Sequence, residues 1–327
     1  MFPNGTGQGH CRAGVRVKKL EETSAPKRRR AVVLCAGIAV VDFIFRVERF
    51  PTPSTKAPTQ EFLVTGGGCA ANAAIAIARL GGEARFAGPL GDDEHAARIL
   101  DGLARDGVDT GGVTRVPGAG TSISGIFVDA SGERLLTTRR AHALATARPI
   151  FPERLVQDVD AVLADNHFAD FVIPICAAAR ARGIPVVLDI DKPSEKNHPL
   201  LALASHAIFS AEALRETSGI DALASALVAA GKFCRGFLAV TDGADGALWR
   251  AGEAGGHQPA FAVEAIDTLA AGDVFHAAFA LALAESRGEA EGLRFASAAA
   301  GLKCTRFGGI IGTPFRAEVE RLMEQQK

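Results

Sequence analysis

Two carboxylates separated by small residues stand directly before a long apolar run in the sequence. Residues 267–273 read DTLAAGD, and the following VFHAAFALALA is typical of a buried helix. Small residues at a helix start leave backbone N–H groups uncovered, and the helix dipole adds partial positive charge, so an anion can bind there. Asp273 adds a negative side chain at the same point. The pattern predicts a group that is deprotonated beside a group that accumulates negative charge, although Asp267 and Thr268 could also simply cap the helix.

Polar residues in the N-terminal third of the chain have the right types to bind a small molecule. Asp42 follows the apolar run AVVLCAGIAVV, and we expect it at the end of a buried strand. Gly67 and Gly68 precede an Ala-rich helix, where glycine allows the backbone to approach a ligand closely. Asn72 follows with both a donor and an acceptor suited to hydroxyl groups. The structural alternative is a loose loop with an incidental asparagine.

The stretch VTDGADG, residues 240–246, follows another apolar strand pattern. The hydroxyl of Thr241 and the backbone N–H groups around Gly243 and Gly246 can surround phosphate oxygens. An Asp-Gly turn inside a hairpin is the competing interpretation. The Walker-A spacing is absent, and GPLGDDEHA is not a dinucleotide fingerprint, so the sequence supports neither of these phosphate-binding folds.

Short apolar strands alternate with Ala-rich helical stretches along most of the chain, as in DAVLADN, PVVLDID, HAIFS and GFLAVTDG. This alternation predicts one large α/β domain whose parallel sheet is covered by helices on both faces. Ligands bind at the carboxyl ends of the strands in such sheets, which is where the motifs above fall. Two segments, about 45–65 and 113–140, instead show exposed alternating patterns and predict a small β-sheet lid. Residues 1–30 are basic and poor in large apolar side chains, and we expect a disordered extension.

The composition excludes several classes of function. The chain has 327 residues, a net charge of −1 and 48% hydrophobic residues, so it has no overall charge that would attract nucleic acid. No apolar run approaches the roughly 18 residues of a membrane span. The six cysteines are scattered, without a C-x-x-C pair or metal-ligand spacing, which argues against disulfides or zinc and for the cytoplasm.

GGGCAAN and DTLAAGD, in this order and about two hundred residues apart, resemble the two signatures of the ribokinase (PfkB) carbohydrate kinases. The resemblance covers about residues 31–320, and the kinase domain is expected over residues 31–325. It implies a ribokinase-like three-layer α/β/α fold with a β lid, and ATP-dependent phosphoryl transfer to a sugar or nucleoside hydroxyl. By this resemblance Asp273 is the catalytic base, and the N–H groups of Ala270, Ala271 and Gly272 stabilise the transferred phosphoryl group.

The resemblance also implies Mg²⁺ and an adenine site. The family's N-x-x-E motif is not intact, because Ser210 replaces its asparagine, so Mg²⁺ is expected to bind mainly through phosphates and waters, with Glu212 or Asp189 assisting. LRFASAAAGLKCTRFGGIIGTP resembles ketohexokinases and, more closely, 6-deoxy-6-sulfofructose kinases, which implies that Ala300 and Cys304 lie near the adenine.

Ribokinases further suggest a monovalent cation such as K⁺. Its ligands here would be Asp267 and the carbonyl groups of Leu269 and of residues 306–308.

The identity of the sugar remains open at this point. Asp42, Gly67, Gly68 and Asn72 are expected to bind hydroxyl groups of any sugar. Lys56 matches a lysine of the sulfofructose kinases that would meet an anionic end, but His167 stands where those enzymes have arginine, and Thr138 where they have asparagine. Arginine is the stronger fixed donor, so a neutral ketose or related furanose is as compatible as a sulfosugar.

Two other functions also remain open. A nucleoside kinase of the same family would need an aromatic surface for its base, and only Phe50 and Phe62 occur near the first lid segment. A sugar-sensing protein that no longer turns over is the third possibility, which the intact Asp273 argues against. The resemblance also favours a homodimer formed through the lid.

Overall fold

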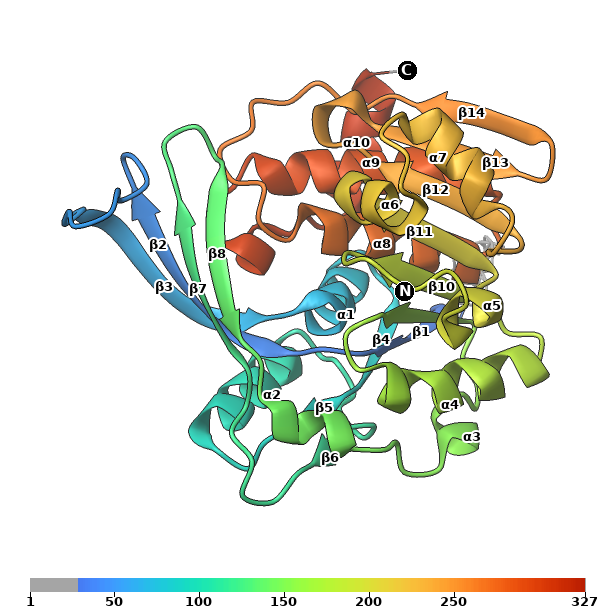
Figure 1. Cartoon of the computed structure of the whole chain (residues 1–327), viewed down its shortest axis with the longest axis horizontal. Helices are drawn as coiled ribbons and strands as arrows, with labels where there is room; N and C mark the ends of the chain where they lie inside the picture. Colours follow the sequence, from blue (N-terminus) through green and yellow to red (C-terminus); the bar gives the residue numbers. More distant parts are fainter. Residues whose placement is uncertain (1–28, 327) are drawn as a thin grey trace, which may run out of the picture.

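The computed structural model describes residues 29–326 (Figure 1). The predicted N-terminal extension, residues 1–30, therefore lies almost wholly outside the described residues.

A large eight-stranded sheet forms the centre of the molecule, in the order β14–β13–β12–β11–β10–β9–β1–β4. The strands are β1 (Val32–Ala36), β4 (Glu83–Ala87), β9 (Ala161–Asp165), β10 (Val186–Ile190), β11 (His206–Ser210), β12 (Phe237–Thr241), β13 (Ala247–Ala251) and β14 (Ala254–Gln258). The neighbouring strands β4, β1, β9, β10, β11 and β12 run parallel to one another. Strands β13 and β14 form an antiparallel edge. Every residue of β1, β9 and β10 is buried, as the uninterrupted apolar runs predict.

Helices cover both faces of this sheet, so the predicted three-layer α/β/α architecture is confirmed. One face packs against α1 (Cys69–Arg79), α2 (Glu94–Arg105), α8 (Ala271–Ala284), α9 (Glu289–Cys304) and α10 (Arg316–Gln325). The other packs against α3 (Pro152–Leu155), α4 (Ala169–Ala181), α5 (Pro199–Leu203), α6 (Ala211–Ser218) and α7 (Leu223–Ala230). Residues 274–282 of α8 are all buried, and their many alanines allow close contact with the neighbouring helices.

A four-stranded small sheet stands beside the main domain, in the order β3–β2–β7–β8 (Figure 1). Its strands are β2 (Val40–Val47), β3 (Thr59–Gly67), β7 (Ile123–Val128) and β8 (Arg134–Arg139). Burial alternates along β7, which places one face against a small apolar cluster that includes Ile44 and Leu269. A two-residue pair, β5 (Pro89–Leu90) and β6 (Thr114–Arg115), and three short helices, η1 (His142–Thr146), η2 (Gly243–Asp245) and η3 (Gly309–Gly312), complete the fold.

The first apolar run of the sequence is divided between the two sheets. The chain leaves the large sheet after Ala36 and enters the small sheet at Val40, so Asp42 lies inside β2 and not at the end of a strand of the large sheet, as we had expected. Glycine is needed at position 37, where the chain passes between the sheets, because the Cβ of any other residue would lie only 2.0 Å from a carboxylate oxygen of Asp165. Residues on both sides of the break are buried, and hydrophobicity alone therefore could not reveal it.

Candidate active site

Asp273 lies in the first turn of α8 and faces Asn72 of α1. The Asn72 amide Nδ2 donates a hydrogen bond of 2.6 Å to Asp273 Oδ2. The Oδ1 atom of the same amide is buried and has no partner among residues 29–326, so it is free to accept a hydrogen bond from a ligand. Removal from bulk water raises the pKa of Asp273, and the hydrogen bond from Asn72 opposes that rise. The pair thus presents a carboxylate suited to accept a proton.

The start of α8 leaves backbone N–H groups free beside this carboxylate. Ala270 precedes the helix in a left-handed conformation, with φ of 65°. The N–H of Ala271 donates to the carbonyl of Thr268 at 3.2 Å, whereas we find no partner in the described part of the chain for the N–H groups of Ala270, Gly272 and Asp273. We had expected the N–H group of Ala271 to face the phosphoryl group. The structure corrects this, because that N–H group is hydrogen-bonded within its own turn. The free N–H groups at the start of α8 can together bind an anion.

Asp42 approaches the same place from the small sheet. Its side chain is buried, which raises the pKa of the carboxyl to about 7, with a further rise from the negative charge of Asp273. Gly67 lies against it, because a Cβ at that position would be 1.9 Å from Asp42 Oδ2. Gly68 caps α1 with φ of 92°, and a Cβ there would be 2.8 Å from the carbonyl oxygen of Ile38. Both glycines are thus required by close packing around Asp42 and the start of α1.

His167 lies in the loop that follows β9. Its Nε2 donates to Asp191 Oδ2 at 2.9 Å, and the thiol of Cys69 donates to the same oxygen at 3.5 Å. The ligand atoms of Cys69, Asp189 and Asp273 lie within 4.8 Å of one another, which connects this group to the carboxylate of Asp273. The structure therefore brings Asp42, Gly67, Gly68, Asn72, His167 and Asp273 into one site at the carboxyl ends of the strands.

Sequence reasoning missed three residues of this site, namely Cys69, Asp165 and Asp191. Asp165 is buried and accepts N–H bonds from Ile38 at 2.7 Å and from His167 at 3.0 Å, which positions the loop that carries the histidine. Asp165 ends β9, and Asp191 directly follows β10. A carboxylate closing a buried apolar strand was the signal that singled out Asp42, and the same signal would have found both.

The predicted nucleotide residues lie further along the same edge of the sheet. Ser210 and Thr241 are direct neighbours across β11 and β12. Ser210 Oγ accepts the N–H of Ala213 and caps α6, while Gly243 begins the short helix η2 and Gly246 follows it, with φ of 55° and 86°. A Cβ at position 246 would lie 2.2 Å from the carbonyl oxygen of Gln258, whereas position 243 has open space around it. Ala300 and Cys304, on α9, are partly buried.

The sequence profile described as "pfkB family carbohydrate kinase" matches residues 30–316, which is most of the chain. The chain belongs to this family. It is 31% identical to fructokinase-1 of Zea mays over 330 residues, covering 90% of this chain and 98% of the relative. It is 29% identical to the ribokinase of Bacillus subtilis, covering 88% of this chain and 97% of the relative.

Solved structures agree with this assignment. A proposed ribokinase from Agrobacterium tumefaciens superposes with a TM-score of 0.87 at 38% identity, covering 91% of this chain and 98% of that one. The ribokinase of Arabidopsis thaliana, in complex with ribose and ATP, gives a TM-score of 0.79 at 26% identity and covers 90% and 99%. The protein is thus a ribokinase-like carbohydrate kinase of the pfkB family. No helix within the described residues is long and apolar enough to cross a membrane.

Mg²⁺ fits the site of this pfkB kinase only in part. Asp189 and Asp273 offer carboxylate oxygens, which suit Mg²⁺, but the third nearby ligand atom is the thiol of Cys69, which does not. Burial and the charges of Asp191 and Asp273 raise the pKa of Asp189 well above its usual range, so a cation here would relieve repulsion between carboxylates. Glu212 is exposed on α6. The residues are consistent with an ion held mainly by phosphates and waters.

A monovalent cation does not fit at Asp267. The ammonium group of Lys303 donates to the backbone carbonyl of Asp267 at 2.8 Å and lies 3.2 Å from Oδ2 of its side chain. The prediction of K⁺ at Asp267 is therefore corrected, because the kinase fills this position with a positive charge of its own. Lys303 could not be recognised from the sequence, since a lysine near the end of a helix usually faces solvent.

Lys56 is not near the other predicted residues. It lies in the exposed loop between β2 and β3 and makes no hydrogen bond with any residue that the structure describes. This loop is at the free end of the small sheet (Figure 1). A role for Lys56 in binding sugar would require the small sheet to move toward the main domain.

Proposed function

We propose that this kinase transfers the γ-phosphate of ATP to a primary hydroxyl of a ketose or related furanose sugar. The observation that carries the proposal is the Asn72–Asp273 hydrogen bond beside the open start of α8. It brings the free amide oxygen of Asn72 on α1 next to a proton acceptor and backbone donors for an anion at the start of α8.

The reaction follows from these groups. Asp42, Asn72 and the backbone at Gly67 and Gly68 hold the sugar hydroxyls. Asp273 takes the proton of the attacking hydroxyl, whose oxygen forms a bond to the γ-phosphorus while the bond from that phosphorus to the β–γ bridging oxygen breaks and ADP leaves. The free N–H groups at the start of α8 stabilise the charge on the transferring group. The raised pKa of Asp273 favours proton uptake during this step.

The nucleotide would occupy the remaining predicted residues. Ser210, Thr241, Gly243 and Gly246 line the carboxyl ends of β11 and β12 and would hold the phosphates and ribose, with Ala300 and Cys304 of α9 near the adenine. Burial raises the pKa of the Cys304 thiol, so this cysteine acts by packing and not as a nucleophile. Mg²⁺ would neutralise the phosphate charge and would be held largely through phosphate oxygens and waters.

The charges around the sugar favour a neutral substrate. Asp191 keeps its negative charge in the inner part of the site, because burial raises its pKa less than the hydrogen bonds from His167 and Cys69 lower it, and an anionic sugar would be repelled there. Hydroxyl groups, in contrast, can donate to this carboxylate.

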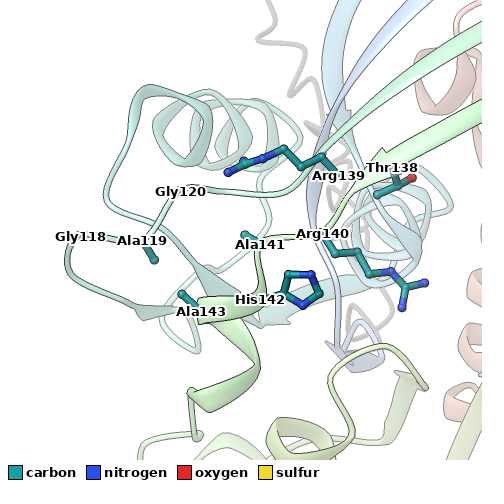
Figure 2. A pocket seen from close by; sticks show the side chains of 9 residues that line it. All are labelled: Gly118, Ala119, Gly120, Thr138, Arg139, Arg140, Ala141, His142 and Ala143. Carbon is teal, nitrogen blue, oxygen red and sulfur yellow. The ribbon is translucent and has the colours of Figure 1, made fainter.

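An acidic sugar is the second candidate, and one observation favours it. A hollow of about 550 Å³ is lined by residues 118–120 and 138–143, and Figure 2 shows the side chains of Arg139 and Arg140 extending in opposite directions. Burial lowers the pKa of the Lys192 ammonium group, and the nearby positive charge of Arg140 lowers it further. Arg140 and Lys192 would bind a sulfonate or phosphate end of the sugar. Lys56 would join them if the small sheet closes as a lid.

A substrate panel tests the proposal. ADP release would be measured with fructose, ribose, 6-deoxy-6-sulfofructose and inosine as acceptors. We expect fructose to give the highest kcat/KM and inosine the lowest. A preference for inosine would establish a nucleoside kinase instead, and ATP hydrolysis that no acceptor stimulates would contradict the proposal.

Lys56→Ala separates the neutral and acidic candidates. The substitution removes a charge-assisted contact and should reduce kcat/KM for sulfofructose far more than for fructose. Equal losses for both sugars would remove Lys56 from this role. Lys232→Ala, which changes an exposed lysine after α7, is the matched control.

We also propose that the kinase forms a homodimer through the small sheet. Phe62, Phe45, Phe127 and Leu135 are neighbours in register across its four strands, and they form an apolar row whose two ends are each 49% exposed. A second copy of the sheet would cover this row. Leu135→Glu should yield monomers in analytical ultracentrifugation, and a monomeric unmodified protein would contradict the proposal.

A further inference from the structure

Lys303 carries a positive charge into the interior of the kinase. Its side chain is completely buried in the last turn of α9, and so is the side chain of its partner Asp267. Its ammonium group has two oxygen partners, the backbone carbonyl of Asp267 at 2.8 Å and the Oδ2 atom of the same residue at 3.2 Å. A buried ammonium group is retained only with such partners, because its removal from water is otherwise unfavourable.

The Asp267 carboxylate connects this charge to two loops. Its Oδ1 accepts the N–H of Leu269 at 2.8 Å, and its Oδ2 accepts the N–H groups of Gly308 and Gly309 at 2.8 and 2.9 Å. The backbone N–H of Asp267 also donates to the carbonyl of Cys304. The turn that enters α8 and the loop that follows α9 are therefore held together around one ion pair.

This turn leads directly into the proposed phosphoryl site. Only Thr268, Leu269 and Ala270 separate Asp267 from α8, and Ala270 holds a left-handed conformation that non-glycine residues rarely adopt. A shift of the turn would move the free N–H groups of Gly272 and Asp273. Such a shift of about 1 Å can reduce a rate by on the order of 10²-fold.

We propose that the ammonium group of Lys303 takes the place of a bound monovalent cation, so that this kinase holds its phosphoryl-binding turn in position without K⁺. One carbonyl oxygen and one carboxylate oxygen at 2.8–3.2 Å from a single positive charge are two of the oxygen contacts that such an ion would make. Lys303 is a positioning residue, since it touches the turn and not the reacting atoms. The activity arm of the test rests on the proposed function, whereas the stability arm does not.

The first measurement compares the unmodified kinase in KCl, NaCl and tetramethylammonium chloride at equal ionic strength. We expect the same Tm and the same kcat with MgATP and sugar in all three salts, because the cation is part of the chain. A kcat that depends strongly on K⁺, or a Tm that K⁺ raises, would overturn the proposal.

The second measurement uses Lys303→Ala, which removes the charge and leaves space for a small ion. In tetramethylammonium chloride we expect a lower Tm and a kcat reduced on the order of 10²-fold. KCl or NH₄Cl should restore much of both, since K⁺ and NH₄⁺ can occupy the vacated position. Equal Tm values for Lys303→Ala in KCl and tetramethylammonium chloride would overturn the proposal.

Two further variants make the result specific. Lys303→Met keeps the bulk of the side chain without its charge, and we expect it to be destabilised without rescue by K⁺, because the thioether fills the space. Rescue equal to that of Lys303→Ala would contradict the model of an exchanged ion. Lys232→Ala should behave as the unmodified kinase in every salt. The Tm comparisons require no substrate, so they remain decisive even if none of the tested sugars is phosphorylated.

Discussion

Asn72 and Asp273 are 201 residues apart in sequence and are joined by a hydrogen bond of 2.6 Å between the asparagine amide and the aspartate carboxylate. The bond fixes the orientation of the amide, because only its NH₂ group can donate to a carboxylate. The free Oδ1 atom is consequently directed at whatever ligand approaches Asp273. In the proposed reaction, Asn72 would therefore both orient the base and present an acceptor to the sugar.

Asp273→Asn should reduce kcat by about 10² or more, because the amide keeps the shape of the side chain but cannot take the proton of the attacking hydroxyl. The affinity for sugar, measured by calorimetry, should change little. Asp101→Asn, at an exposed position of α2, is the matched control. A near-normal kcat for Asp273→Asn would exclude this residue as the base.

Asn72→Ala should move the acid limb of the pH–rate profile to higher pH. The hydrogen bond from Asn72 lowers the pKa of Asp273, so its loss leaves that carboxyl protonated up to a higher pH, where it cannot act as a base. At alkaline pH the loss of kcat should be smaller than at acid pH. The profile of kcat against pH checks this expectation, and an unmoved acid limb would show that the bond does not tune Asp273.

Asp42→Asn should flatten the dependence of stability on pH. The pKa of Asp42 rises from 3.8 to about 7 in the folded protein, chiefly through burial. Its contribution to folding is therefore fully present below the unfolded pKa and is lost as pH rises through about 7, by up to roughly 4 kcal/mol. Urea unfolding at pH 4 and pH 8 should show a smaller difference for Asp42→Asn than for the unmodified kinase. Parallel behaviour of the two proteins would contradict the raised pKa.

Arg134→Gln should weaken the use of ATP. Arg134 at the start of β8 donates to the carbonyl of Thr268 at 3.0 Å, and Thr268 in turn donates to the carbonyl of Gly132, so the tip of the small sheet contacts the turn before α8. Loss of this contact and of its positive charge should lower kcat/KM for ATP by about tenfold. Arg105→Gln on the surface of α2 should have no effect. Equal kinetics for the two variants would show that the contact is not functional.

The elements that repeat a simple pattern were predictable from the sequence. Continuous apolar runs predicted the parallel strands, and DTLAAGD predicted a helix start with a carboxylate in its first turn, as α8 and Asp273 show. The break between β1 and β2 was not predictable, because residues on both sides of Gly37 are buried in different sheets. The Lys303–Asp267 pair was also not predictable, because a charged residue on a helix usually indicates a solvent-exposed position. Only the fold brings Lys303 next to its partner, which is 36 residues away in the sequence.

The small sheet takes its strands from two stretches of the chain, residues 40–67 and 123–139, with α1 of the main domain following directly after the first. It cannot have been added to the fold by one insertion, nor can it be exchanged with that of a relative by one replacement. A chimaera that carries a new sugar-facing sheet must replace both stretches together. Replacing only one would disrupt the parallel register between β2 and β7, including the pairing of Asp42 with Ser124.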